Sequence, residues 1–145
     1  KLDEINKIFE INFFNQIFFT QGLLRNIMKT KNGSIIFLSS SAAQDGNIGR
    51  SAYSSSKAAL ASFAKVLSRE LGAQKIRVNT ISPGLTETDM MIDSTAKEYL
   101  ENIVKEIPLK RIANPADVSK LILYLSSDLS EYITGQDLRI DGGLK

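Results

Sequence analysis

Residues 34–57 read SIIFLSSSAAQDGNIGRSAYSSSK, and the order of features in this stretch decides the fold. It begins with a short, uninterrupted apolar run at residues 34–39, which is typical of a parallel strand covered on both faces. A loop of small residues follows, and Ser51 then stands where an N-cap would begin a long helix. Strand, loop and helix in this order indicate one unit of an α/β fold with a parallel sheet.

The segments on either side continue this alternation of helices and strands. We expect a long helix over residues 3–29, apolar on nearly every face and therefore buried on several sides or at a subunit contact. Ser51 should begin a helix that ends at Leu71, with Gly72 at its C′ position. The core-facing residues of this second helix are expected to be Leu60, Phe63, Ala64, Leu67 and Leu71.

Two more strands and another helix are expected in the second half of the chain. Strands are predicted at residues 76–82 and 133–140, the second closed by the turn of Asp141, Gly142 and Gly143. Residues 85–114 look irregular, with a short helix near 96–105. Asn114 should cap a helix over 115–127, whose inward residues are Val118, Leu121, Ile122 and Leu125. The fold class is therefore α/β, as half of a doubly wound parallel sheet with covering helices.

Composition removes several classes of function. The chain has no cysteine and no histidine, so a thiolate site, a histidine-bound zinc and a Ser-His-Asp triad cannot be built from it alone. Acid/base chemistry must then fall to Tyr, Lys, Asp or Glu. A net charge of +2 with scattered basic residues gives no indication of nucleic acid, and no stretch is apolar for long enough to cross a bilayer. We expect a cytoplasmic protein.

Tyr53 and Lys57 form the best candidate for chemistry. They are four residues apart and share one face of the predicted helix. A free phenol has a pKa of about 10 and is a poor acid or base at neutral pH. An ammonium group one helical turn away favours the phenolate and lowers that pKa. The pair alone is a weak signal, because a packed tyrosine and a solvated lysine would show the same spacing.

The positions of other polar residues strengthen this interpretation. Ligands of open α/β sheets bind beyond the carboxyl ends of the strands. Ser40 follows the first predicted strand, and Pro83 and Gly84 follow the second. A hydroxyl, a phenol and an ammonium are therefore expected at one edge of the sheet.

Five motifs in order resemble the short-chain dehydrogenase/reductase family, closest to its 3-oxoacyl-acyl-carrier-protein reductase-like group. Asn12 stands in FEINFFNQIFFTQ, Ser40 in IIFLSSSAA thirteen residues before Tyr53, and Tyr53 and Lys57 in SAYSSSKAAL. ISPGLTETDM and YITGQDLRIDGG complete the set. The resemblance implies that residues 1–145 are the C-terminal part of one NAD(P)-binding Rossmann-fold domain.

The resemblance also implies roles for individual residues. Tyr53 is the general acid toward a carbonyl oxygen, or the base in reverse, and Ser40 holds that oxygen by a hydrogen bond. Lys57 assists Tyr53 and binds the nicotinamide ribose, and Asn12 binds a water that links Lys57 to solvent. The full set of implied cofactor-binding residues is Tyr53, Lys57, Pro83, Gly84, Thr86 and Thr88.

The same resemblance defines the expected cofactor and partners. The cofactor is NADP or NAD, with NADPH favoured by the resemblance only, and no metal is expected. Helices 3–29 and 51–72 correspond to the family's dimer interface, so we expect a homo-oligomer, a dimer or tetramer. The family's glycine-rich turn precedes the matched region. We therefore expect a whole protein of roughly 240 residues, and no activity from the isolated chain.

The expected reaction is NAD(P)H-dependent interconversion of a ketone and a secondary alcohol, with a 3-oxoacyl thioester as one substrate class. Residues 85–108 correspond to the family's substrate lid. A non-catalytic binding or oligomerisation module with the same fold, and an epimerase or lyase that uses the same Tyr-Lys pair, stay open as alternatives. Loss of Ser40, Tyr53 or Lys57 would have favoured the module, and a larger C-terminal substrate domain would have favoured the epimerase.

Overall fold

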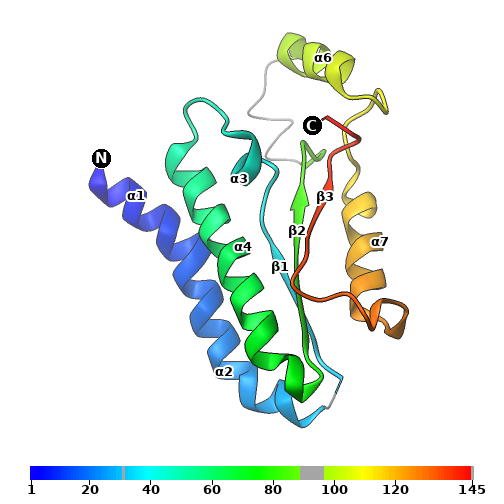
Figure 1. The fold of residues 1–145 in the computed structure, drawn as a ribbon. Helices are drawn as coiled ribbons and strands as arrows, with labels where there is room; N and C mark the ends of the chain where they lie inside the picture. Colours follow the sequence, from blue (N-terminus) through cyan, green and yellow to red (C-terminus); the bar gives the residue numbers. More distant parts are fainter. Residues whose placement is uncertain (31, 89–96, 145) are drawn as a thin grey trace.

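A sheet of three parallel strands forms the centre of the computed structural model, which describes residues 1–30, 32–88 and 97–144 (Figure 1). The strands are β1 (Ser34–Leu38), β2 (Arg77–Pro83) and β3 (Asp137–Ile140), in the order β1-β2-β3. Ser34 pairs with Arg77, and Thr80 pairs with Asp137. Because parallel neighbours need a crossover, helices lie between them in sequence, as the alternating pattern predicted.

The long N-terminal helix is present but contains an irregularity. It consists of α1 (Leu2–Phe9), the π-helical segment η1 (Glu10–Phe14) and α2 (Asn15–Lys29), and the extent predicted for residues 3–29 is confirmed. The π-helical segment was not predicted. Such segments are short and occur frequently at functional sites. Asn12 lies in the middle of this one.

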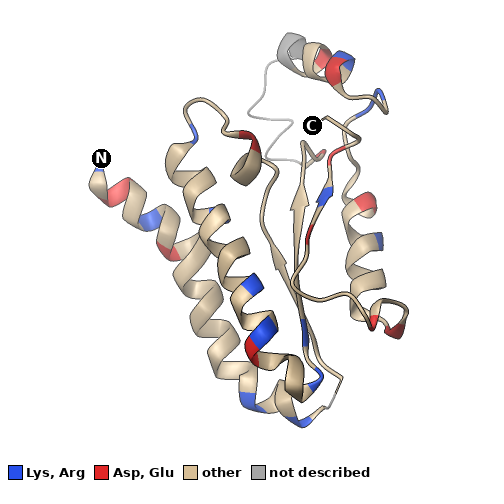
Figure 2. Ribbon diagram, in the orientation of Figure 1, with Lys and Arg blue, Asp and Glu red and all other residues tan. Residues whose placement is uncertain are grey.

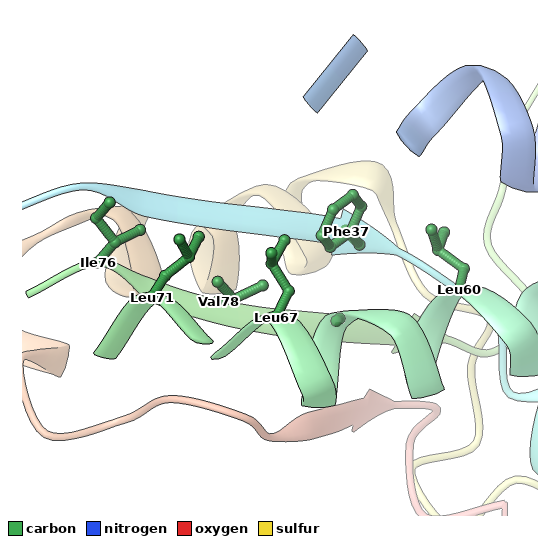
Figure 3. Packing of buried hydrophobic residues seen from close by; sticks show 7 residues of the cluster. Phe37, Leu60, Leu67, Leu71, Ile76 and Val78 are labelled. Atoms are coloured by element: carbon green, nitrogen blue, oxygen red, sulfur yellow. The ribbon is translucent and has the colours of Figure 1, made fainter. Parts of the chain in front are cut away.

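Helix α4 (Ser51–Leu71) packs along α1 and η1 and covers one face of the sheet (Figure 1). Its predicted stripe is confirmed, with Phe63 partly buried and the other members buried. Figure 3 shows Leu60, Leu67 and Leu71 of this helix directed toward the strands. They pack against Phe37, Ile76 and Val78. Burial of these side chains fixes α4 on β1 and β2, and this fixes where its first turn lies.

The predicted bounds of α4 are confirmed, but both predicted caps need correction. Arg50, and not Ser51, is the residue before the helix, and it makes no side-chain cap. Gly72 has right-handed backbone angles and begins a short 3-10 turn, η2 (Gly72–Gln74). The left-handed residue comes later, at Lys75 with φ 59°. Because the 3-10 turn follows the helix directly, the left-handed residue that ends this segment stands three residues later than predicted, at Lys75 instead of Gly72.

Helix α7 (Pro115–Ser126) covers the opposite face of the sheet (Figure 1). The predicted Asn114 cap is confirmed, and the Asn114 side chain accepts a hydrogen bond from the Ala116 amide at 2.9 Å. Val118 and Leu125 are buried against Ile81, with Leu121 and Ile122 partly buried beside them. The two faces of the sheet therefore carry separate apolar clusters.

The last strand is shorter than predicted, because residues 133–136 lie outside β3. Two main-chain hydrogen bonds to β2 remain there, from the Gly135 amide to the Val78 carbonyl at 2.7 Å and from the Thr80 amide to the Gln136 carbonyl at 2.8 Å, and side chains make the others. The Val78 amide donates to Thr134 Oγ1 at 3.0 Å, and the Gln136 amide donates to Asn79 Oδ1 at 3.1 Å. Gly135 has φ 71°, a left-handed conformation outside the range of a regular strand.

Three short elements complete the described part of the chain. A one-turn helix, α3 (Ala42–Asp45), lies inside the segment predicted as a loop, and η3 (Asp128–Ser130) follows α7. The short helix expected near 96–105 is α6 (Lys97–Glu106), and residues 89–96 of the expected substrate lid lie outside the described residues. Among the described helices, none has the length and apolar character needed to span a bilayer.

Candidate functional site

The carboxyl ends of β1 and β2 lie beside each other, as the parallel sheet requires. The Ser39 amide donates to the Ile81 carbonyl at 2.8 Å, and the Ser41 amide donates to the Pro83 carbonyl at 2.9 Å. Pairing therefore continues past the end of β1, and Ser40 lies between these two hydrogen-bonded neighbours. The loop after β1 and the turn after β2 are brought together at one edge of the sheet.

Lys57 connects α4 to this edge. Its ammonium Nζ donates to the carbonyl of Leu38, the last residue of β1, at 2.8 Å. The same Nζ lies 6.0 Å from the centre of the Tyr53 ring. The ammonium group is thus near both the phenol ring and the strand end that Ser40 follows.

Burial changes the electrostatics of this ammonium group. Lys57 is half-buried, and removal of water lowers its pKa below the ordinary value of 10.5, because the charged form loses solvation. A poorly solvated cation acts more strongly on a nearby negative charge than one in water does. The arrangement therefore favours an anion that develops beside Lys57, such as a phenolate.

Ser39 and Ser40, the two serines that directly follow β1, have different contacts. Ser39 is buried, and its Oγ donates to the Lys57 carbonyl at 2.9 Å, which fastens the strand end to α4. Ser40 is half-buried, and its Oγ accepts from the Ala42 amide at 3.2 Å. Within the described residues the Ser40 hydroxyl donates no hydrogen bond, so its proton is available to a ligand. These contacts favour Ser40 over Ser39 as the binding hydroxyl.

Asn12 reaches α4 through a serine that the sequence analysis missed. Its Nδ2 donates to Ser56 Oγ at 3.1 Å, and Ser56 Oγ donates to the Tyr53 carbonyl at 2.7 Å. Ser56 is fully buried. The sequence SSSK does not distinguish Ser56 from the serines beside it, because its contact with Asn12 joins residues 44 positions apart. The structure thus places Asn12 one hydrogen-bonded residue away from the backbone of Tyr53.

Gly84 follows β2 in close contact with the end of β3. Its amide donates to the Ile140 carbonyl at 2.8 Å. A Cβ atom at this position would lie 2.8 Å from Asp141 Cβ and 2.9 Å from Asp141 Cα, so only glycine fits. Thr86 Oγ1 donates to the Gly84 carbonyl at 3.1 Å, and Thr86 forms an isolated bridge with Ala113. Thr88 is exposed at the end of this described segment.

A cavity of about 310 Å³ borders Tyr53. Its lining comes from α1, from the two residues before α4 and from the first turn of α4: Ile8, Gly49, Arg50, Ser51, Ala52 and Tyr53. A volume of this size is at the lower end of the range of small-molecule sites. Arg50 was not predicted as a site residue, and it brings a positive charge to this cavity.

Comparisons with known proteins show which proteins this chain resembles. A family model described as enoyl-(acyl carrier protein) reductase matches residues 1–145. The chain is 37% identical to 3-oxoacyl-(acyl-carrier-protein) reductase FabG of Chlamydia pneumoniae, over 98% of this chain and 57% of that protein. It is 38% identical to an uncharacterized short-chain type dehydrogenase/reductase of Sinorhizobium fredii, over 95% of this chain and 55% of that protein.

A solved structure shows the same likeness in three dimensions. The crystal structure of a 3-oxoacyl-(acyl-carrier protein) reductase from Brucella melitensis matches with a TM-score of 0.93 at 30% identity. The match covers 99% of this chain and 53% of that one. This chain therefore spans little more than half the length of the proteins it resembles.

Proposed function

This chain belongs to the short-chain dehydrogenase/reductase family, and on that premise we propose that the whole protein is an NAD(P)H-dependent oxidoreductase. The reaction is the interconversion of a ketone and a secondary alcohol. One observation carries the proposal: the half-buried Lys57 ammonium lies 6.0 Å from the Tyr53 ring and bonds to the end of β1, the strand that Ser40 follows. The Tyr53 phenol, the Lys57 ammonium and the Ser40 hydroxyl together provide the groups needed to bind and protonate a carbonyl oxygen.

Each of the three side chains has one task in the reduction. The Ser40 hydroxyl donates a hydrogen bond to the carbonyl oxygen of the substrate and holds that oxygen in place. The Tyr53 hydroxyl gives its proton to that oxygen as the negative charge develops there. The Lys57 ammonium stabilises the phenolate that remains on Tyr53. Asn12, through Ser56, keeps the backbone of Tyr53 in position, and its proposed water link to Lys57 adds a route for reprotonation.

The residues present fit a nicotinamide cofactor, which would supply the hydride. Gly84 lacks a Cβ atom in a turn where none would fit, which brings the backbone to the edge of the site. We assign cofactor binding to this turn, with Pro83, Thr86 and Thr88, and to the side chains of Tyr53 and Lys57. NADPH is proposed over NADH from the family resemblance.

The finer proposal for the substrate is a 3-oxoacyl thioester. Two of the similar proteins carry a 3-oxoacyl reductase name. The cavity beside Tyr53 combines the apolar Ile8 with the cationic Arg50, a lining that suits an acyl chain with an anionic end. We also propose that the protein is a cytoplasmic homo-oligomer.

An assay of cofactor oxidation tests this function. The whole protein is mixed with NADPH or NADH and an acetoacetyl thioester, and cofactor absorbance is followed. We expect oxidation that Tyr53→Phe abolishes and that Tyr132→Phe leaves intact, because Tyr132 is 100% exposed and lies outside the site. A folded whole protein that binds neither nucleotide would contradict the proposal and favour a non-catalytic binding module.

A further inference from the structure

Arg139 on β3 binds two segments that carry proposed site residues. We call residues 39–45 the Ser40 loop and residues 83–86 the Gly84 turn. Nη1 of Arg139 donates to Asp45 Oδ1 at 2.7 Å, and Nη2 donates to Asp45 Oδ2 at 3.1 Å. Nε and Nη2 donate to Asp141 Oδ2 at 2.9 and 2.6 Å. Figure 2 shows the alternating opposite charges along β3.

The contact with Asp45 fixes the end of the Ser40 loop. Asp45 is the last residue of α3, and α3 begins two residues after Ser40. Planar, two-pronged pairing of a guanidinium with a carboxylate is strong and restricts orientation. The neighbouring Gln44 strengthens the attachment, because its Nε2 donates to Asp137 Oδ2 at 2.8 Å. The Ser40 loop is therefore held at its beginning by main-chain bonds of Ser39 and Ser41 to β2, and at its end by the contact of Asp45 with β3.

The contact with Asp141 fixes the surface against which the Gly84 turn packs. Asp141 Cα and Cβ are the atoms that a Cβ at Gly84 would meet, at 2.9 and 2.8 Å. A rotation or shift of Asp141 would therefore move this turn. Only 9% of the Asp141 side chain is exposed, against 13% for Asp45 and 21% for Arg139. These ion pairs are thus better shielded from solvent than ordinary surface pairs, which are worth little.

We propose that Arg139 is a positioning residue, which sets the Ser40 hydroxyl and the Gly84 turn relative to each other by binding Asp45 and Asp141 with one guanidinium group. The inference rests on the proposed function, in which Ser40 holds the carbonyl oxygen and the Gly84 turn holds the cofactor. Arg139 donates side-chain hydrogen bonds to Gln44, Asp45 and Asp141, and so it acts on Ser40 and Gly84 through these residues. Because a guanidinium presents donors in a rigid fork, lysine cannot hold both carboxylates in the same geometry.

The test separates the two contacts in the whole protein. Asp45→Asn weakens only the Ser40 loop, so kcat should fall about tenfold to 100-fold, the size of effect that small displacements at a reacting centre produce. KM for NADPH should stay within about twofold of wild type. Arg139→Gln releases both segments, so kcat should fall and KM for NADPH should rise. Asp45→Glu, which keeps the carboxylate, should recover part of kcat.

Asp117→Asn is the matched control. It also removes an aspartate from an arginine pair, Arg111–Asp117 at 2.6 Å, but on α7. It should lower thermal stability and leave kcat and KM unchanged. An active wild-type protein in which Asp45→Asn and Asp117→Asn give the same kinetics would overturn the positioning role and leave the proposed function in place.

A second measurement decides the inference if the wild-type protein oxidises no cofactor, which would defeat the proposed function instead. Hydrogen exchange of the Ser41 and Ala43 amides reports on the Ser40 loop, because both donate main-chain hydrogen bonds there. Exchange should become faster in Asp45→Asn and stay unchanged in Asp117→Asn. Equal exchange in the wild type and in both variants would overturn the inference without any assay of activity.

Discussion

Among single residues, Lys57 links the physics of burial most directly to the proposed chemistry. Its pKa is lowered by loss of solvent, and its ammonium bonds to Leu38 at the strand end. Such a group gains more from a nearby phenolate than a solvated lysine would. The residue types and spacing at the site were readable from the sequence, but this desolvation was not, because it depends on the packing of α4 against β1.

Replacement of Lys57 tests this coupling. In Lys57→Met no ammonium stabilises the Tyr53 phenolate, so alcohol oxidation at pH 7 should slow by about 100-fold or more. The pH at which oxidation is half-maximal should also rise. Lys57→Arg, which keeps a positive charge, should retain more of the rate. Measured pH–rate profiles that coincide for the wild type and Lys57→Met would contradict the role.

Ser56 and Arg139 show what the sequence could not reveal at this scale. Ser56 contacts Asn12, and Arg139 contacts Asp45 from 94 positions away. Neither residue stands in a pattern of its own, because each acts through a partner that only the fold brings near. Local spacing identifies groups on one helix or at strand ends, and it does not identify such distant pairs.

Among the elements, α7 was predicted best because its signals are local. Asn114, Pro115 and Asp117 form a capping box with proline at the first helical position, and the apolar stripe has helical spacing. β3 was predicted too long, because the left-handed Gly135 and the side-chain hydrogen bonds of Thr134 and Asn79 interrupt a regular ladder before Asp137. The π-helical segment has no sequence signal that we could identify.

The start of α7 gives a prediction about pH. The hydrogen bond from Arg111, assisted by the Asn114 amide, lowers the pKa of Asp117 to about 2 from 3.8. A lowered carboxyl pKa stabilises the folded state above pH 3.8, and this contribution is lost as the pH falls toward 2. Asp117→Asn should therefore lower Tm at about pH 6, and the difference from wild type should shrink below about pH 4.

Thermal unfolding at several pH values measures this effect. Glu131→Gln, which removes an exposed carboxylate outside α7, is the control and should leave Tm unchanged throughout. A Tm difference for Asp117→Asn that is the same at about pH 6 and about pH 3 would show that the charge of Asp117 is not responsible.

The Gly84 turn gives a second prediction for an element. In Gly84→Ala the new methyl group would lie 2.8 Å from Asp141 Cβ, so the turn must move away from β3. We expect KM for NADPH to rise by about tenfold, because backbone placed to bind the cofactor is displaced. In Gly22→Ala, on α2, nothing lies within 4 Å of the new atom, and KM should not change. Titration of both variants with NADPH checks this prediction. Equal KM values for Gly84→Ala and Gly22→Ala would contradict it.

At the scale of the whole molecule, the outer side of the N-terminal helices remains apolar. The exposed large apolar side chains of η1 and α2 are Ile11, Phe14, Phe18, Phe19, Leu23 and Met28. Exposed apolar surface of this extent commonly marks an interface. A subunit contact was predicted here because the helix is apolar on nearly every face. Its aromatic side chains Phe14, Phe18 and Phe19 stay exposed although α4 covers another side of this helix.

Charge placed on this surface tests the homo-oligomer. Phe18 is 66% exposed, so Phe18→Lys should cost the fold little and should prevent close contact between copies. Light scattering coupled to size exclusion should show a smaller species than wild type. Leu129→Lys, at an 80% exposed position in η3, should leave the mass unchanged. A mass for Phe18→Lys equal to that of the wild type would show that the subunits do not associate through this surface.

The most direct test of the central claim is a double-mutant cycle on Ser40 and Tyr53 in the whole protein. If both groups act on one carbonyl oxygen, Ser40→Ala and Tyr53→Phe should each lower kcat/KM by about 100-fold or more. The kcat/KM of the double variant should then be little lower than that of the less active single variant, because the effects of residues that act as a unit are not additive. Losses that multiply fully would show two independent roles, and single variants with wild-type rates would contradict the account.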